Sequence, residues 1–154
     1  MTVRLRVRSR SVPSAITIEQ LIHAPRERVW ADIADLSSHV EWMGDAESIR
    51  FLGDATGGVG ARLEVATRVG PLRTVDVMEL TAWQPPERMA IRHEGLVSGD
   101  GEFVLEVRGD DTLFRWTEHL RFPLRLGGRV GELAARPVLR AVWRRNLGRL
   151  ARRF

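Results

Sequence analysis

The middle of the chain holds six segments with the composition of β-strands, and the connections between them are too short to contain helices. The strands are predicted at 48–52, 62–69, 74–83, 88–94, 102–108 and 113–122. Turn-forming residues fill the gaps, as in Gly70-Pro71 and in Gly109-Asp110-Asp111. Consecutive parallel strands would need longer crossovers, usually helical. The pattern therefore predicts an antiparallel meander.

Strand and helix patterns flank this meander. A strand is predicted at 15–22, a helix begins at Pro25, and a second short helix runs through 40–43. Near the C-terminus, apolar residues recur at steps of three and four, with arginines on the opposite side. This apolar stripe comprises Leu139, Val142, Trp143, Leu147, Leu150 and Phe154. Pro137 either starts this long helix or kinks one that begins near Arg129.

The element order predicts an α+β fold. A curved antiparallel sheet of six to seven strands wraps around the long C-terminal helix, and two short helices follow the first strand. A curled sheet of this size cannot close its concave face alone, so a hollow under the helix is the expected ligand site. The 154 residues suit one domain, which we place at 15–154. Residues 1–14, with alternating arginines, are predicted to be a basic arm or an extra edge strand.

Three short stretches resemble a known family. They are Ile22-His23-Ala24-Pro25 followed by Val29-Trp30, then Trp83-Gln84-Pro85-Pro86-Glu87-Arg88, and Thr112-Leu113-Phe114-Arg115-Trp116-Thr117. Their order is similar to that of the START-like (SRPBCC) superfamily, most closely its polyketide cyclase/dehydrase branch. The resemblance covers about residues 15–153. It implies the helix-grip fold and a cavity for a hydrophobic ligand such as a lipid, sterol or polyketide.

The chain departs from that family at two points. His23 stands where an acidic residue is usual, and the tyrosine that some cyclases place in the pocket is absent because the chain has no tyrosine. No catalytic residue therefore carries over by motif. The resemblance implies enzymatic activity only for some members, so the sequence leaves open whether this chain is an enzyme.

The amino acids that are missing exclude several chemistries. The chain has no cysteine and no lysine, which excludes thiolate nucleophiles, cysteine-ligated zinc and Schiff-base catalysis. The four histidines lie far apart, and no dinucleotide fingerprint is present. One of them, His39, is expected with Asp32 and Asp35 on the exposed side of a helix. We therefore expect neither a metal nor a cofactor.

Charge is distributed unevenly along the chain. Residues 121–154 contain ten arginines and one glutamate, whereas residues 11–120 contain nineteen acids against ten arginines. We expect no nucleic-acid partner and no integral membrane association. The arginine-rich helix predicts at most a weak, salt-screened contact with anionic surfaces. The expected location is cytoplasmic, the oligomeric state is open, and the charge asymmetry alone supports an alternative role as an interaction domain.

Side chains alternate between the two faces of a strand, so apolar positions indicate which residues face the hollow. Two titratable residues share these positions. Glu118, between Trp116 and Leu120, is a candidate general acid or base, or a rim residue paired with an arginine of the last helix. His93 is a candidate to exchange a proton or polarise a carbonyl, or a histidine merely hydrogen-bonded in place. With one strand between them, we expect the pair about 10 Å apart.

The remaining candidates are ligand contacts. Gln20 is expected to orient Glu118 or a ligand oxygen, or to make a simple contact at the rim. Trp42, on the short helix that overhangs the cavity mouth, is a candidate ligand contact or gate residue, or an ordinary core residue. The other predicted contacts are Thr67, Met89, Phe103, Trp116 and Trp143. The first functional hypothesis is a domain that binds one hydrophobic molecule. The alternative is a cyclase or dehydratase that uses Glu118 and His93 for acid–base chemistry on a carbonyl substrate.

Overall fold

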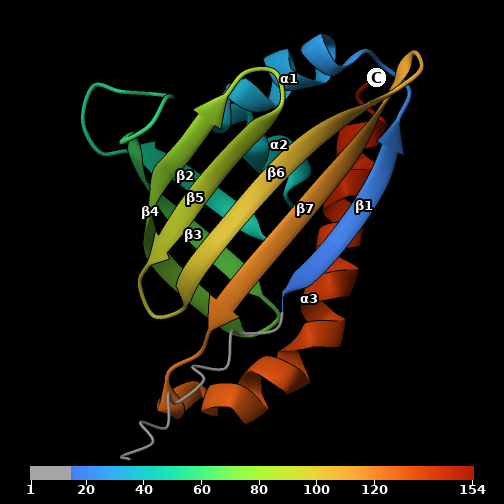
Figure 1. Ribbon diagram of the computed structural model, residues 1–154. Helices are drawn as coiled ribbons and strands as arrows, with labels where there is room; N and C mark the ends of the chain where they lie inside the picture. Colours follow the sequence, from blue (N-terminus) through green and yellow to red (C-terminus); the bar gives the residue numbers. More distant parts are fainter. Residues whose placement is uncertain (1–14) are drawn as a thin grey trace, which may run out of the picture.

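The computed structural model describes residues 15–154, so the predicted arm or edge strand at 1–14 lies outside the described residues. Seven antiparallel strands form one sheet in the order β1-β7-β6-β5-β4-β3-β2 (Figure 1). The strands are β1 (Ile16–Ile22), β2 (Ala46–Phe51), β3 (Arg62–Val69), β4 (Leu72–Gln84), β5 (Arg88–Glu94), β6 (Ser98–Arg108) and β7 (Asp111–Arg121). From β2 to β7 each strand pairs with the next, which confirms the predicted meander.

The first strand forms the edge of the sheet next to β7. β1 pairs with β7, with Ile16 opposite Glu118 and Ile18 opposite Trp116. The chain then crosses to the opposite edge through α1 (Arg26–Ala34), the 3₁₀ turn η1 (Leu36–Ser38) and α2 (His39–Trp42). These short helices lie at one end of the sheet (Figure 1). They seal that end of the core with Val29, Trp30, Ile33 and Leu36, all buried.

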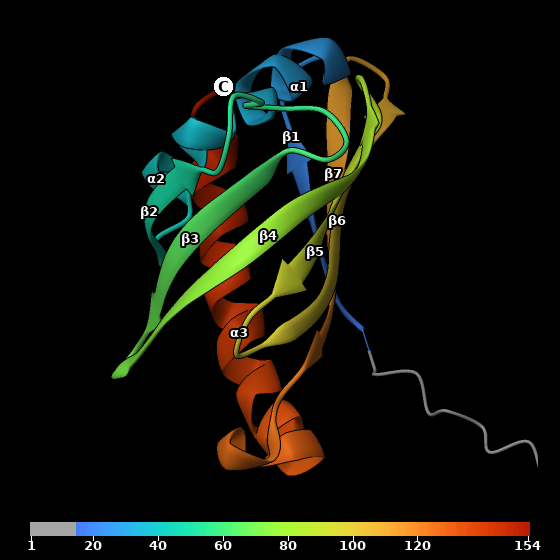
Figure 2. The same cartoon turned by 90° about the vertical axis from the view of Figure 1, so that its left-hand side faces the viewer.

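A second 3₁₀ turn, η2 (Leu124–Leu126), leads into the long helix α3 (Gly128–Ala151), which runs along the concave side of the sheet (Figure 2). Its C-terminal half packs into the core through Trp143, Leu147 and Leu150. The α+β helix-grip architecture predicted from the sequence is therefore confirmed. Within residues 15–154, no helix is both long enough and apolar enough to span a bilayer.

Pro137 lies inside α3, so the helix begins before the proline and does not start at it. Proline has no N–H to donate to the carbonyl four residues earlier, and its ring crowds that carbonyl. The helix changes direction between its first turns, drawn in orange, and the rest, drawn in red (Figure 1). Before the proline, Val130 and Leu133 are exposed, so the helix buries an apolar stripe in its C-terminal half only.

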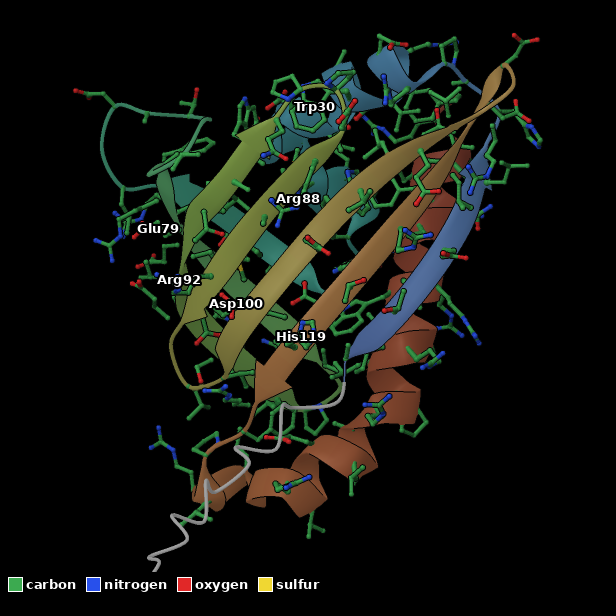
Figure 3. The ribbon with its side chains drawn as sticks, in the orientation of Figure 1. Trp30, Glu79, Arg88, Arg92, Asp100 and His119 are labelled. Carbon is green, nitrogen blue, oxygen red and sulfur yellow. The ribbon has the colours of Figure 1, made fainter. Side chains whose placement is uncertain are left out.

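Both faces of the sheet follow the alternation of the strands, apart from register shifts in the β2–β3 and β4–β5 pairings. On the convex face Glu79, Arg92, Asp100 and His119 lie side by side across β4, β5, β6 and β7 (Figure 3). On the concave face, the register between β4 and β5 shifts between Leu80 and Ala82. Such a shift lets residues on both sides of it face the same way. It places Leu80 in the core and also lets Trp83 pack edge-on against Trp30, with 5.3 Å between ring centroids.

Candidate functional site

A cavity of about 270 Å³ lies between the concave face of the sheet and α3. Most of its wall is apolar and comes from strands β3 to β7 and from the helix. The apolar lining includes Leu63, Val65, Leu80, Met89, Phe103, Trp116, Leu139 and Trp143. The Trp116 and Trp143 rings stack with their centroids 5.3 Å apart, so they form one aromatic part of the wall. The expected hollow under the helix is therefore present.

A buried carboxylate and an imidazole meet in this wall. Glu118 on β7 is only 4% exposed, and the Nε2 atom of His93 on β5 lies 3.0 Å from its Oε2 atom. The indole N–H of Trp116 donates a hydrogen bond to the other carboxylate oxygen at 2.8 Å. Both carboxylate oxygens thus have a partner inside the protein. Glu118 is not a rim residue, and its partners are His93 and Trp116 and not an arginine of α3.

The predicted separation of about 10 Å between Glu118 and His93 is wrong, because the intervening strand carries no side chains at this point. Gly101 of β6 lies opposite Glu118 on one side and opposite Ile91 on the other. Gly99 lies opposite His93. Gly101 leaves a gap on the concave face of β6 that the Glu118 carboxylate fills, and the side chains of β5 and β7 meet across it. The sequence signal is the repeated glycine in Ser98-Gly99-Asp100-Gly101, whose composition by itself indicates only a turn.

The surroundings of His93 favour its protonated form. Burial opposes protonation, but the adjacent Glu118 carboxylate, with Asp76 and Asp100 further away, outweighs it and raises the pKa of His93 above its ordinary value. The imidazole therefore keeps its proton up to a higher pH than an ordinary histidine does. This pair can store and release a proton, which is the capacity expected of an acid–base site.

Asp76 on β4 is a second buried carboxylate in the cavity wall. One of its oxygens, Oδ1, accepts a hydrogen bond of 2.9 Å from the Leu96 backbone N–H. Gly95 packs directly against the Asp76 side chain, leaving no space for a Cβ atom. Asp76 was missed from the sequence because the two faces of β4 cannot be assigned by parity when the register shifts further along the strand.

A third polar group connects α3 to the loop before β2. The buried Asn146 side chain accepts a hydrogen bond from the Gly44 N–H at 2.9 Å and donates one to Asp45 at 2.6 Å. Burial raises the pKa of Asp45, which lines the cavity, against the opposing effect of the Asn146 hydrogen bond. Asn146 thus ties the cavity wall to the helix that covers it.

His39 also lines the cavity, although its spacing from Asp32 and Asp35 suggested the exposed side of a helix. The 3₁₀ turn η1 interrupts that spacing and turns the ring inward, where Nε2 donates to the Ile33 carbonyl at 2.8 Å. Burial lowers the pKa of His39 to about 4. His39 is therefore neutral at pH 7, whereas His93 in the same wall favours its protonated form.

Most predicted ligand contacts line the cavity, namely Thr67, Met89, Phe103, Trp116 and Trp143. Two do not. Gln20 lies opposite Phe114, two pairs further along β1 than Trp116's partner, and its amide bonds to the Leu21 carbonyl. Trp42 is fully buried against Phe103 and Trp116, and its neighbour Met43 reaches the cavity instead. Within residues 15–154, no group of three histidine or acidic side chains is arranged to hold a metal ion.

The family model described as "Polyketide cyclase / dehydrase and lipid transport" matches residues 14–154. The chain belongs to this family. Membership confirms the resemblance drawn from the three short stretches. A search of curated proteins finds no significant match.

Solved structures share the fold of this family member at low sequence identity. TTHA0849 from Thermus thermophilus is 20% identical, with a TM-score of 0.75, and the match covers 91% of this chain and 96% of that one. The Zhui aromatase/cyclase from Streptomyces sp. R1128 is 19% identical, with a TM-score of 0.68 and coverages of 90% and 91%. A START superfamily protein from Mycobacterium smegmatis is 12% identical, with a TM-score of 0.71 and coverages of 91% and 99%.

Proposed function

We propose that this polyketide cyclase/dehydrase family member binds one mostly apolar small molecule in the cavity between its sheet and α3. The observation that carries the proposal is the cavity itself, a largely apolar space of about 270 Å³ with a few convergent polar groups. Such a combination is typical of small-molecule sites. The volume suits a compact ligand, and Trp116 and Trp143 give it an aromatic part of the wall to pack against.

Buried apolar area supplies the affinity, at roughly 25 cal/mol per Å² removed from water. The polar groups contribute orientation. His93, with its raised pKa, is a donor beside the Glu118 carboxylate, and Thr67 is a hydroxyl on the opposite part of the wall. A ligand oxygen placed near His93 fixes one end of the molecule, while its apolar body lies along the tryptophan wall.

The test is a matched pair of variants on β3. Thr67 lines the cavity, whereas the next residue, Arg68, is exposed and pairs with Glu47 on the surface. Thr67→Phe fills part of the cavity and is expected to abolish uptake of an apolar probe such as naphthalene. Arg68→Phe adds the same ring outside and leaves uptake unchanged. The readout is quenching of Trp116 and Trp143 fluorescence, supported by native mass spectrometry. Equal uptake by both variants would refute the cavity as the binding site.

A second candidate function is acid–base catalysis on a carbonyl compound. The observation that favours it is the direct His93–Glu118 contact at 3.0 Å in the wall of the cavity. The fraction of His93 that is neutral can remove a proton from the carbon next to a carbonyl, and Glu118 stabilises the resulting imidazolium. The protonated ring can then return the proton to a departing hydroxyl, which leaves as water.

Hydrogen exchange separates binding from catalysis. 2-Tetralone is an apolar bicyclic ketone whose α-protons exchange with D₂O when a base removes them. The wild-type protein is expected to accelerate that exchange, and Glu118→Gln to abolish the acceleration while the dissociation constant stays within a few-fold of wild type. The conservative change Thr117→Ser, on the other face of β7, serves as control. Parallel loss of binding and exchange in Glu118→Gln would assign Glu118 a structural role.

A further inference from the structure

We infer that the cavity selects apolar molecules that carry hydrogen-bond donors, hydroxyl or amine groups, and rejects molecules of the same shape that carry a carboxylate. The inference rests on the proposed binding function and specifies its ligand class. It comes from the charges that line the cavity, not from the cavity's size.

The cavity wall is acidic. Asp45, Asp76 and Glu118 all line it, and they come from three different parts of the chain. Among residues 15–154 no arginine belongs to the lining, although arginine is the most frequent charged residue of the chain. His93 is the one lining group whose surroundings favour a positive charge, and Glu118 already occupies its Nε2 atom. Because Glu118 already pairs with His93 and balances its charge, an incoming carboxylate meets Asp45 and Asp76 with no arginine in the lining to oppose them.

Asp76 and Glu118 both act on His93. Asp76 lies on β4 two residues from Met78, which pairs with His93, and both carboxylates line the cavity near the imidazole. Glu118 has partners for both oxygens, Trp116 and His93. Asp76 receives the Leu96 N–H at Oδ1, which leaves Oδ2 as the acceptor that a ligand can use. A hydroxyl or ammonium group donates to such an oxygen, whereas a ligand carboxylate has no proton to donate at neutral pH.

Like charges in this position carry a large penalty. Two unit charges about 6–10 Å apart, at an effective dielectric constant of about 20, repel strongly enough to weaken binding by roughly tenfold to a hundredfold. Most of the rest of the lining is apolar, so few polar groups offset this repulsion. Fatty acids and aromatic acids are therefore excluded, while phenols, alcohols and amines of the same skeleton are accepted.

Three probes that share one ring system test this selectivity. 2-Naphthol, 2-naphthylmethylamine and 2-naphthoate are titrated by calorimetry into the wild-type protein at pH 7.5. The expected result is that the naphthoate binds at least roughly tenfold more weakly than the naphthol, and that the amine binds at least as tightly as the naphthol. Asp76→Asn is expected to reduce the ratio of the naphthoate to the naphthol dissociation constant. Asp110→Asn, which removes an acid from the exposed turn between β6 and β7, leaves the ratio unchanged.

Each outcome distinguishes this inference from the binding function beneath it. If the naphthoate binds as tightly as the naphthol or more tightly, the selectivity is refuted and the binding function stands. If both aspartate variants change the ratio of the naphthoate to the naphthol dissociation constant equally, the role given to Asp76 is refuted and the binding function stands. If none of the three probes binds to protein that is folded by circular dichroism, the binding function fails and this inference fails with it.

Discussion

Gly101 on β6 lies directly opposite Glu118 on β7, and the Glu118 carboxylate occupies the space that a Cβ atom at position 101 would need. The backbone at Gly101 is not in the left-handed region. Glycine is therefore required here by the space that the Glu118 carboxylate occupies, and not by the backbone conformation. The absence of one side chain on β6 thus lets two side chains on the neighbouring strands form a hydrogen bond.

This relationship predicts the effect of Gly101→Ala. The new methyl group must displace the Glu118 carboxylate, which breaks its hydrogen bonds with His93 and Trp116 in a buried place. We expect a loss of about 1–3 kcal/mol in the free energy of unfolding, measured by urea denaturation. Gly148→Ala is the control, because a Cβ atom there meets only an ordinary contact with Arg152. It should leave stability unchanged or raise it slightly. Equal stability of both variants would contradict the role given to Gly101.

The His93 titration tests the same pair through charge. Burial opposes the charged imidazole, and Glu118 contributes most to raising the pKa of His93 against it. In Glu118→Gln the negative charge is gone and burial remains, so the pKa of His93 is expected to fall below its wild-type value. A group with a raised pKa stabilises the fold fully below its unfolded value of about 6.5, and this stabilisation is lost as pH rises through the raised value.

Imidazole resonances followed by NMR against pH provide the measurement. The exposed His23, bonded to Asp111 at the surface, serves as an internal reference that the substitution should not move. An unchanged His93 titration in Glu118→Gln would mean that the two side chains are not coupled in solution.

Much of this site could be predicted from alternation along the strands, and the remainder could not. Parity placed Glu118, His93, Met89 and Trp116 on the concave face, because those strands are regular. Strand alternation failed at Asp76, because a register shift lies further along β4. Helical spacing failed at His39, because a 3₁₀ turn interrupts the helix before it. The contact between His93 and Glu118 depends on Gly101. The alternation rule assigns side chains to faces, so it makes no prediction for the space left by a glycine. Asn146 was missed because its helical position looks polar and exposed until its partner loop is known.

His39 predicts a pH dependence of opposite sign to that of His93. Its pKa is lowered to about 4 in the folded protein, since burial disfavours the charged ring. The unfolded chain, with an ordinary histidine pKa of about 6.5, binds a proton more readily, so stability falls as pH drops from about 6.5 towards 4. His39 alone is expected to lower the free energy of unfolding by about 2 kcal/mol between pH 7 and pH 5.

The check is urea denaturation of the wild type and His39→Gln at both pH values. Glutamine keeps an N–H donor for the Ile33 carbonyl but does not titrate. The variant should lose less stability on acidification than the wild type. If the wild type and His39→Gln lose the same free energy of unfolding on acidification, a group other than His39 causes the loss.

The exposed apolar residues at the start of α3 predict contact with anionic lipid surfaces at low salt. Leu124 is 93% exposed, Val130 76% and Leu133 64%, and the arginines of η2 and α3 lie among them in the sequence. Apolar side chains of this kind insert at the lipid interface, while arginine favours anionic headgroups. Vesicles containing phosphatidylglycerol should sediment the protein at about 20 mM salt and release it near 150 mM, where the Debye length is about 8 Å. Leu133→Ser should weaken binding, whereas the exposed Ala141→Ser, on the other side of Pro137, should not. Equal sedimentation with uncharged phosphatidylcholine vesicles at both salt concentrations would contradict an electrostatic contact.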